Sequence, residues 1–141
     1  MAEAPRELLV RIEVPRGSLV KWGADGGIDF LSPLPCPFNY GSVPGEVAPD
    51  GDPPDALVLG PSADRGASLP ARVVGRVRFL DDGQQDDKLI CLPAGRREGP
   101  TPAELRRIRA FFRLYAAVKA ASRRLRLRRG PTCFEGLDLS G

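Results

Sequence analysis

A short segment of the chain concentrates negative charge in a backbone that cannot become a helix. Asp50, Asp52 and Asp55 fall within six residues, and Pro53 and Pro54 stand between the last two. Proline fixes its own φ angle and restricts the residue before it, so this segment must form a loop. Carboxylates this close raise one another's pKa unless a cation lies among them. The segment therefore predicts a cation site and a fold that brings positive charge to it.

A second acidic segment lies between two apolar runs, residues 73–80 and 89–92. It contains four aspartates and a lysine: Asp81, Asp82, Asp86, Asp87 and Lys88. A hairpin turn explains Asp82 and Gly83, but it does not explain the other acidic residues. Oxygen ligands supplied by two loops suit Mg²⁺ or Mn²⁺ rather than zinc.

The chain has no histidine, and this limits the chemistry it can perform. Serine–histidine and cysteine–histidine nucleophiles are excluded, as are zinc hydrolases with histidine ligands. Two divalent ions between the acidic segments would lower the pKa of a shared water and neutralise a phosphate leaving group. The residues thus favour hydrolysis of a phosphoanhydride or ester. The side chains that could donate hydrogen bonds to a phosphate are Lys21, Tyr40, Lys88 and Tyr115.

Composition favours one soluble domain over residues 1–141. Sixteen glycines and fifteen prolines favour a loop-rich β architecture. There is no apolar run of the ~20 residues that a membrane span needs, and no signal-peptide pattern at the N-terminus. Three scattered cysteines suit a reducing compartment, so we expect a cytoplasmic protein without membrane contact.

The net charge of +3 is concentrated in an arginine-rich stretch, residues 123–129. We interpret this stretch as a solvated face and not as a nucleic-acid surface, because it lacks the interleaved aromatic residues that stack on bases.

Hydrophobic spacing predicts a mainly β protein with one long helix. Seven prolines in residues 32–54 exclude a regular element there and predict a long loop. Thr101, Pro102 and Glu104 form a capping box with a proline at the first helical position. A helix to about Arg123 follows, with a core face of Leu105, Ile108, Phe111, Phe112, Tyr115 and Val118. We expect strands over 8–14, 19–22, 28–31, 56–59, 72–80, 88–92 and 124–128, with 19–22 and 28–31 forming a hairpin.

Four linked motifs resemble the soluble family I inorganic pyrophosphatases, and the likeness covers about residues 8 to 93. They are Ile12-Glu13-Val14-Pro15, Asn39-Tyr40-Gly41, the segment from Asp50 to Asp55 and the segment from Asp81 to Lys88. The stretch from Phe111 to Tyr115 continues the likeness. The resemblance implies a compact OB-like five-stranded β-barrel with the long C-terminal helix packed on it. It also implies Mg²⁺ as cofactor, with Mn²⁺ as an alternative, pyrophosphate and phosphate as ligands, and a homo-oligomer.

The resemblance also implies a role for each matched residue. The metal ligands would be Asp50, Asp55, Asp81 and Asp86, with Glu13 supporting a further metal. Asp52 would take the proton from the attacking water, assisted by Tyr40 and Lys88 as catalytic residues. The phosphates would be held by Lys21, Tyr40, Lys88 and Tyr115.

Three positions depart from the family pattern. Phe30 and Ala116 stand where the family has phosphate-binding cations, and Gly23 stands where it has an acid. Lys119, one turn after Tyr115, could replace one of the missing cations. Two functions remain open at this point: a Mg²⁺-dependent pyrophosphatase, and a non-catalytic or weakly active paralogue that binds metal with pyrophosphate, a nucleotide or a protein partner.

Overall fold

The computed structural model describes residues 6–18, 20–22, 28–31, 35–49, 51–81, 83–126 and 131–139. For residues 20–22, 28–31 and 121–126 it describes the backbone only.

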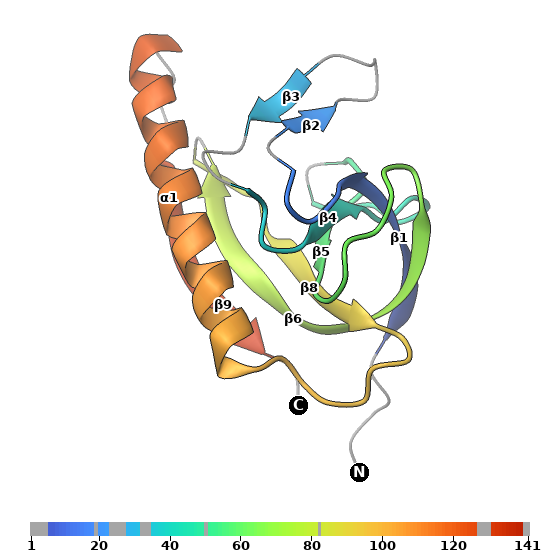
Figure 1. Ribbon diagram of the computed structural model, residues 1–141. Coiled ribbons are helices and arrows are strands. Elements are labelled where there is room, and N and C mark those ends of the chain that lie inside the picture. The colour runs from blue at the N-terminus through green and yellow to red at the C-terminus, as the bar shows by residue number, and fades with distance from the viewer. Residues whose placement is uncertain are drawn as a thin grey trace.

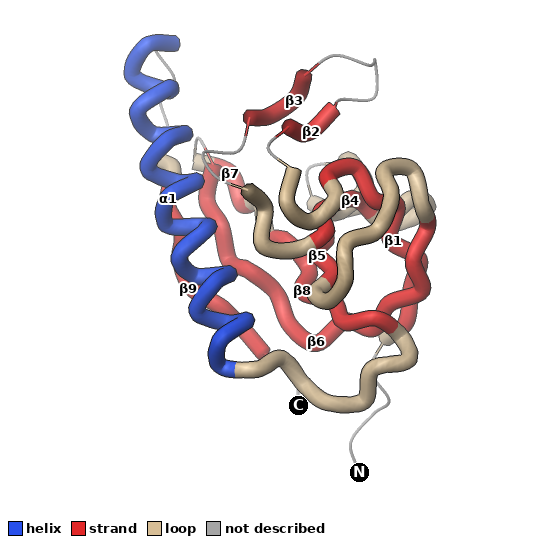
Figure 2. The backbone as a smooth tube through the Cα atoms, in the orientation of Figure 1, coloured by secondary structure: helices blue, strands red, loops and turns tan. Residues whose placement is uncertain are grey.

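Five strands close into a ring. Strand β1 (Glu7–Val14) pairs with β4 (Asn39–Ser42), β4 with β5 (Asp55–Val58), and β5 with β8 (Lys88–Pro93). Strand β6 (Ser68–Asp81) pairs with β8 on one side, and its first residues pair with β1 on the other side. Only the β5–β8 pair is parallel among these contacts. The predicted five-stranded barrel is confirmed, and Figures 1 and 2 show it beside the helix.

The remaining elements extend or cover this ring. Strand β9 (Cys133–Leu139) pairs with the second half of β6, and the short β7 (Gln84–Gln85) pairs with the end of β6. Strands β2 (Val20–Trp22) and β3 (Ile28–Leu31) form an antiparallel pair, as predicted. In Figure 1 this pair stands away from the barrel, while helix α1 (Pro102–Arg126) runs along β6 and β9.

Strands β1 and β6 each contain a β-bulge, and beyond the bulge the side chains point to the opposite face of the strand. Ile12 pairs with Gly41 and Val14 pairs with Tyr40, so Glu13 is an extra residue in β1. Val73 pairs with Cys91 and Gly75 pairs with Ile90, so Val74 is an extra residue in β6. An extra residue bends a strand and increases its twist, which a small closed barrel requires.

The strands bury two hydrophobic cores on their opposite faces. In β5, Leu57 belongs to the core beneath the helix, whereas Ala56 and Val58 belong to the second core. The core beneath the helix also contains Phe111 and Phe112, and both rings are almost fully buried. Among the side chains that the structure describes, the second core contains strand and loop residues and no helix residue. Helix α1 is therefore held by one face of the barrel strands.

The helix begins as the capping box predicts. The Glu104 amide donates to the Thr101 hydroxyl over 3.1 Å, and the Thr101 amide donates to the Glu104 carboxylate over 2.9 Å. Its predicted core face is correct except at one position, because Val118 is 41% exposed whereas Ala116 is buried. None of the helices in the described residues is both long and apolar enough to span a membrane.

Two stretches form a different element from the predicted one. Residues 39–42 form strand β4 inside the stretch predicted as a loop, because they are free of proline and hydrogen-bond to β1 and β5 on both sides. The strand predicted at 124–128 is also wrong, because α1 continues through Arg126 and residues 127–130 lie outside the described part. Arginine and leucine are both good helix formers, so their alternation continues the helix.

Candidate active site

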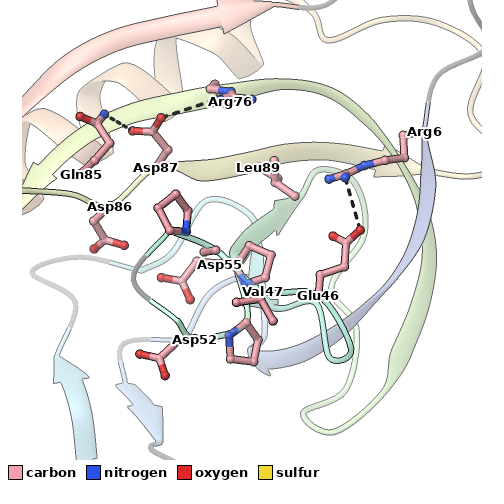
Figure 3. A pocket seen from close by; sticks show the side chains of 14 residues that line it. Arg6, Glu46, Val47, Asp52, Asp55, Arg76, Gln85, Asp86, Asp87 and Leu89 are labelled. Carbon is pink, nitrogen blue, oxygen red and sulfur yellow. Dashed lines mark hydrogen bonds and ion pairs between the residues drawn. The ribbon is translucent and has the colours of Figure 1, made fainter.

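Four aspartates from the two acidic segments line one open pocket: Asp52, Asp55, Asp86 and Asp87. Asp52 and Asp55 come from the loop before β5 and its first residue, and Asp86 comes from the turn before β8. The pocket has a volume of about 870 Å³. Figure 3 shows the carboxylates of Asp52, Asp55 and Asp86 on the same side of this pocket. The fold therefore brings together the two segments that the sequence singled out.

Buried Lys88 bridges two of these aspartates. Its Nζ atom lies 3.2 Å from Asp55 Oδ2 and 2.9 Å from Asp86 Oδ2, and its side chain is only 1% exposed. The parallel register of β5 and β8 places Lys88 directly opposite Asp55. A buried ammonium requires such partners, because desolvation of an unpaired charge is costly. Lys88 thus holds the two acidic segments at a defined separation.

Tyr40 completes this side of the site. Its hydroxyl donates to Asp55 Oδ2 over 2.9 Å, from the adjacent strand β4. Burial raises the pKa of Tyr40 well above its ordinary value, and the negative charges of Asp55 and Asp86 and the nearby Tyr115 raise it further. Tyr40 therefore remains a neutral hydroxyl donor at ordinary pH.

Asp52 has different surroundings from Asp55 and Asp86. It is exposed, and it lies in a tight loop in which its carbonyl accepts the Ala48 amide over 2.8 Å. The Ala48 carbonyl in turn accepts the amide of Gly51, whose φ of +90° favours glycine. This loop presents Asp52 at the rim of the pocket, where water can reach it.

Asp87 also lines the pocket, but its contacts are structural. Its Oδ1 accepts the Phe79 amide over 3.0 Å and the Gln85 side-chain amide over 2.6 Å, and Arg76 lies 3.8 Å from Oδ2. These bonds close the turn that carries Asp86.

Glu13 lies at the β1 bulge and contacts β4. The Ser42 hydroxyl donates to Glu13 Oε1 over 3.0 Å. The neighbouring Gly41 is required by packing, since a Cβ atom there would lie 1.8 Å from the Arg11 carbonyl oxygen. The Asn39-Tyr40-Gly41 motif thus combines a site hydroxyl with the glycine that lets β1 approach. The described residues that line the pocket do not include Glu13, nor do they include Tyr40, Asp81, Lys88 or Tyr115.

Asp81 is held by two residues from the C-terminal part of the chain. Lys119 Nζ, on α1, lies 2.6 Å from Asp81 Oδ2, and the Thr132 hydroxyl lies 3.2 Å from Oδ1. The sequence indicated Lys119 as a substitute cation through its helical spacing from Tyr115. No pattern indicated Thr132, because its contact depends on how the segment before β9 folds back.

Aromatic rings connect Lys88 and Lys119. Lys88 Nζ lies 5.6 Å from the centre of the Phe79 ring, and the Tyr115 ring is 5.5 Å from Phe79. Lys119 Nζ lies 5.2 Å from the centre of the Tyr115 ring. A cation over a ring face is stabilised by the ring's electron distribution. Tyr115, expected to hold phosphate, is therefore positioned between the two lysines.

Two predicted residues cannot be placed at the site. Asp50 lies outside the described residues. Lys21 is on β2, where its backbone pairs with Phe30, but its side chain is outside the described part. Their roles remain predictions.

The donors fit a hard divalent cation, although their present partners are lysines. Within the described ranges, which omit Asp50 and Asp82, no three carboxylate or thiol groups already form a metal cage. Asp55 and Asp86 instead share the ammonium of Lys88, which shows that the pocket stabilises positive charge between its two acidic segments. Carboxylate oxygens are the ligands that Mg²⁺ prefers.

The family model for inorganic pyrophosphatase matches residues 10–129. This range contains every aspartate described above and all of α1. The chain belongs to the inorganic pyrophosphatase family.

Individual members of the family show how far the likeness extends. The inorganic pyrophosphatase of Gluconobacter oxydans is 40% identical over 64% of this chain and 57% of its own length. The soluble inorganic pyrophosphatase of Oryza sativa subsp. indica is 35% identical over 79% of this chain and 60% of its own. The chain thus spans less than two thirds of these curated relatives.

A solved structure of the family matches almost the whole chain. The inorganic pyrophosphatase of Thermus thermophilus superposes with a TM-score of 0.76 and 29% identity, and the match covers 99% of this chain and 86% of that chain.

Proposed function

We propose that this chain hydrolyses inorganic pyrophosphate to two phosphates in the pocket lined by Asp52, Asp55 and Asp86, with Mg²⁺ as its metal. Family membership supports the reaction, and one observation carries the assignment to this pocket. Lys88 bridges Asp55 and Asp86 by ion pairs. Asp52 lines the same pocket but does not pair with that lysine. One carboxylate is thus placed to accept a proton while the others are held for ligation.

The aspartates of both acidic segments would hold the metal. Asp55, Asp81 and Asp86 would ligate Mg²⁺ or Mn²⁺ together with Asp50, and Glu13 would support a further ion. A divalent ion bound there lowers the pKa of a bound water and neutralises the negative charge that develops on the leaving phosphate.

The protein groups have separate tasks in the proposed reaction. Asp52 accepts the proton of the attacking water, which requires an exposed carboxylate within reach of the pocket. Tyr40 and Lys88 fix Asp55 by hydrogen bonds of 2.9 and 3.2 Å. The ammonium of Lys88 has three donors, so one remains for a phosphate, and the Tyr40 hydroxyl would turn to a phosphate when Asp55 ligates the metal. Lys21 and Tyr115 are the further proposed phosphate contacts. Donors fixed before the reaction stabilise developing charge without reorganisation.

We also propose the setting in which the chain works. The setting would be a cytoplasmic location, a single domain over residues 1–141 and a homo-oligomeric state. The rice relative, named a soluble pyrophosphatase, supports the first of these.

Phosphate release from pyrophosphate tests the proposed function. The purified chain should release two phosphates per pyrophosphate with millimolar Mg²⁺, and the rate should fall to background with a chelator. A chain that binds Mg²⁺ and imidodiphosphate, the analogue with nitrogen in place of the bridging oxygen, yet releases no phosphate would be the binding paralogue. A chain that binds neither would contradict both functions.

A further inference from the structure

Two lysines hold three of the four aspartates proposed as metal ligands, but they do so in different ways. Lys88 is 1% exposed and contacts both Asp55 and Asp86. Lys119 is 30% exposed, and among the described carboxylates it pairs with that of Asp81, over 2.6 Å. Lys88 is enclosed by the sheet and cannot leave its partners without unfolding the site. Lys119 reaches Asp81 from the helix surface on a flexible side chain.

The surroundings of Asp81 keep its carboxylate in place when Lys119 moves. The Thr132 hydroxyl lies 3.2 Å from Oδ1, the oxygen that Lys119 does not contact. The hydroxyl is neutral, so it orients the carboxylate without competing for its charge. The contacts of Asp81 thus include a neutral hydroxyl on one oxygen and an ammonium on the other.

Lys119 has a second favourable position close to its present one. Its Nζ atom is 5.2 Å from the centre of the Tyr115 ring, and the Tyr115 ring centre lies 5.5 Å from that of Phe79, the ring that Lys88 Nζ approaches to 5.6 Å. An ammonium that leaves Asp81 can stay over this ring, which faces Phe79 and through it Lys88. At position 116, where the family pattern has a cation, Ala116 is buried against the sheet and offers no such group.

We propose that Lys119 is an exchangeable cation, which occupies Asp81 in the metal-free protein and binds a phosphate of the substrate when Asp81 ligates a divalent ion. This inference rests on the proposed function. An ammonium 2.6 Å from Asp81 Oδ2 and a divalent ion on the same oxygen repel each other, so the two compete for Asp81. The released ammonium then supplies the cation that Ala116 lacks.

Two binding measurements on Lys119→Met test the exchange. Isothermal titration calorimetry with Mg²⁺ alone should give about 3- to 10-fold tighter binding than the parent, because the competing ammonium is gone. Titration of imidodiphosphate at saturating Mg²⁺ should give binding weaker by about 10-fold or more, as expected for a lost charge-assisted hydrogen bond. Lys119→Gln, which keeps a polar side chain but loses the charge, should change both affinities in the same directions.

Arg113→Met is the matched control for the loss of one positive charge. Arg113 is exposed on the same helix and lies 6.0 Å from the Phe134 ring, on β9. Its removal should change both affinities by less than about twofold, because exposed charges are screened by salt.

Each contrary result has a separate meaning. If Lys119→Met binds Mg²⁺ no tighter than Arg113→Met does, Lys119 does not compete for Asp81 and the exchange is wrong. If imidodiphosphate binds the two variants equally well, Lys119 does not bind phosphate and the exchange is again wrong. A parent chain that binds no Mg²⁺ would overturn the proposed function, and the exchange with it.

Discussion

The two sides of the candidate site are built by different parts of the chain. On the barrel side, Tyr40, Asp55 and Lys88 lie on the adjacent strands β4, β5 and β8, in a register set by backbone hydrogen bonds. On the helix side, Asp81 ends strand β6, and its partners Lys119 and Thr132 come from α1 and the segment before β9.

The difference shows which part of the site is rigid before any ligand binds. Lys88 is buried and contacts two carboxylates, so moving it would expose core and leave two charges unpaired. Lys119 is partly exposed and contacts one carboxylate. We conclude that the barrel side sets the geometry of the site and that the helix side adapts to the ligand.

Replacing Lys88 should have the largest effect of any single change at the site. Lys88→Met removes the charge shared by Asp55 and Asp86 while keeping the apolar stem. Loss of one partner of a buried ion pair costs about 3–5 kcal/mol; here about 2–3 kcal/mol is expected in the free energy of unfolding, because the aspartates stay partly exposed. Urea denaturation measures this value, and phosphate release should fall to background.

Lys119→Met is the comparison for this change. It should lower the free energy of unfolding by less than about 1 kcal/mol, the range for partly exposed ion pairs. Equal losses in the two variants would contradict the proposed difference between the barrel side and the helix side.

Gly41→Ala should distort the barrel side through the backbone. The added methyl would lie 1.8 Å from the Arg11 carbonyl oxygen, and backbone atoms cannot move aside as a side chain can. Overpacking costs about 1–3 kcal/mol, and we expect the upper end in thermal or urea unfolding. The matched control is Gly99→Ala, since no atom lies within 4 Å of a Cβ there. Equal stability of the two variants would show that β1 can shift without cost.

Acid should weaken the start of α1 through the ion pair of Arg96 and Glu104. The Arg96 guanidinium bonds Glu104 in two places and lowers the pKa of that carboxyl to about 2. A lowered folded-state pKa stabilises the protein fully above the unfolded value of about 4.5, and this contribution is lost as the pH falls toward 2. Glu104→Gln should lower stability by about 1 kcal/mol at neutral pH and flatten this part of the pH profile.

Measuring phosphate release shows whether the pair of Arg96 and Glu104 influences the helix side of the site. Lys119 lies fifteen residues after Glu104, about 22 Å along the helix axis. Glu104→Gln should therefore leave phosphate release near the parent rate, and a large loss of activity would mean that the start of the helix does reach the site.

Thr132→Val tests how the Asp81 carboxylate is oriented. It should change Mg²⁺ affinity and stability less than the other substitutions. The hydroxyl bond contributes about 0.5–1.5 kcal/mol at most, and the isosteric valine retains the packing. We expect a few-fold lower affinity for Mg²⁺ by calorimetry, with recovery in Thr132→Ser. Failure of Thr132→Ser to recover it would assign the loss to packing and not to the hydroxyl.

Much of the barrel side could be predicted from the sequence because its signals are local. Short-range motifs mark Asp52, Asp55 and Asp86, and alternating apolar residues mark most strands. Strand β4 could not be predicted, because its four residues are stabilised by neighbours on both sides and not by their own propensity. Strand β9 was missed for the same reason, since it pairs with the distant β6.

The helix side was harder to predict because its contacts join distant segments. The bond between Lys119 and Asp81 spans 38 residues, and that between Thr132 and Asp81 spans 51. Helical spacing relates Lys119 to Tyr115, but it does not relate either residue to the end of β6. The roles of Asp50 and Lys21 remain predictions, because the structure does not describe these side chains.

The turnover numbers of Asp52→Asn and Asp87→Asn test the central claim most directly. Both aspartates line the pocket and both receive the same substitution, but only Asp52 is proposed to accept the proton, whereas Asp87 accepts hydrogen bonds that an amide oxygen can still accept. With pyrophosphate and saturating Mg²⁺, Asp52→Asn should lose about 100-fold or more, the range for a general base, while keeping its Mg²⁺ affinity. Asp87→Asn should stay within a few-fold of the parent. Equal turnover in the two variants, or an Asp52→Asn protein as fast as the parent, would contradict the proposed site.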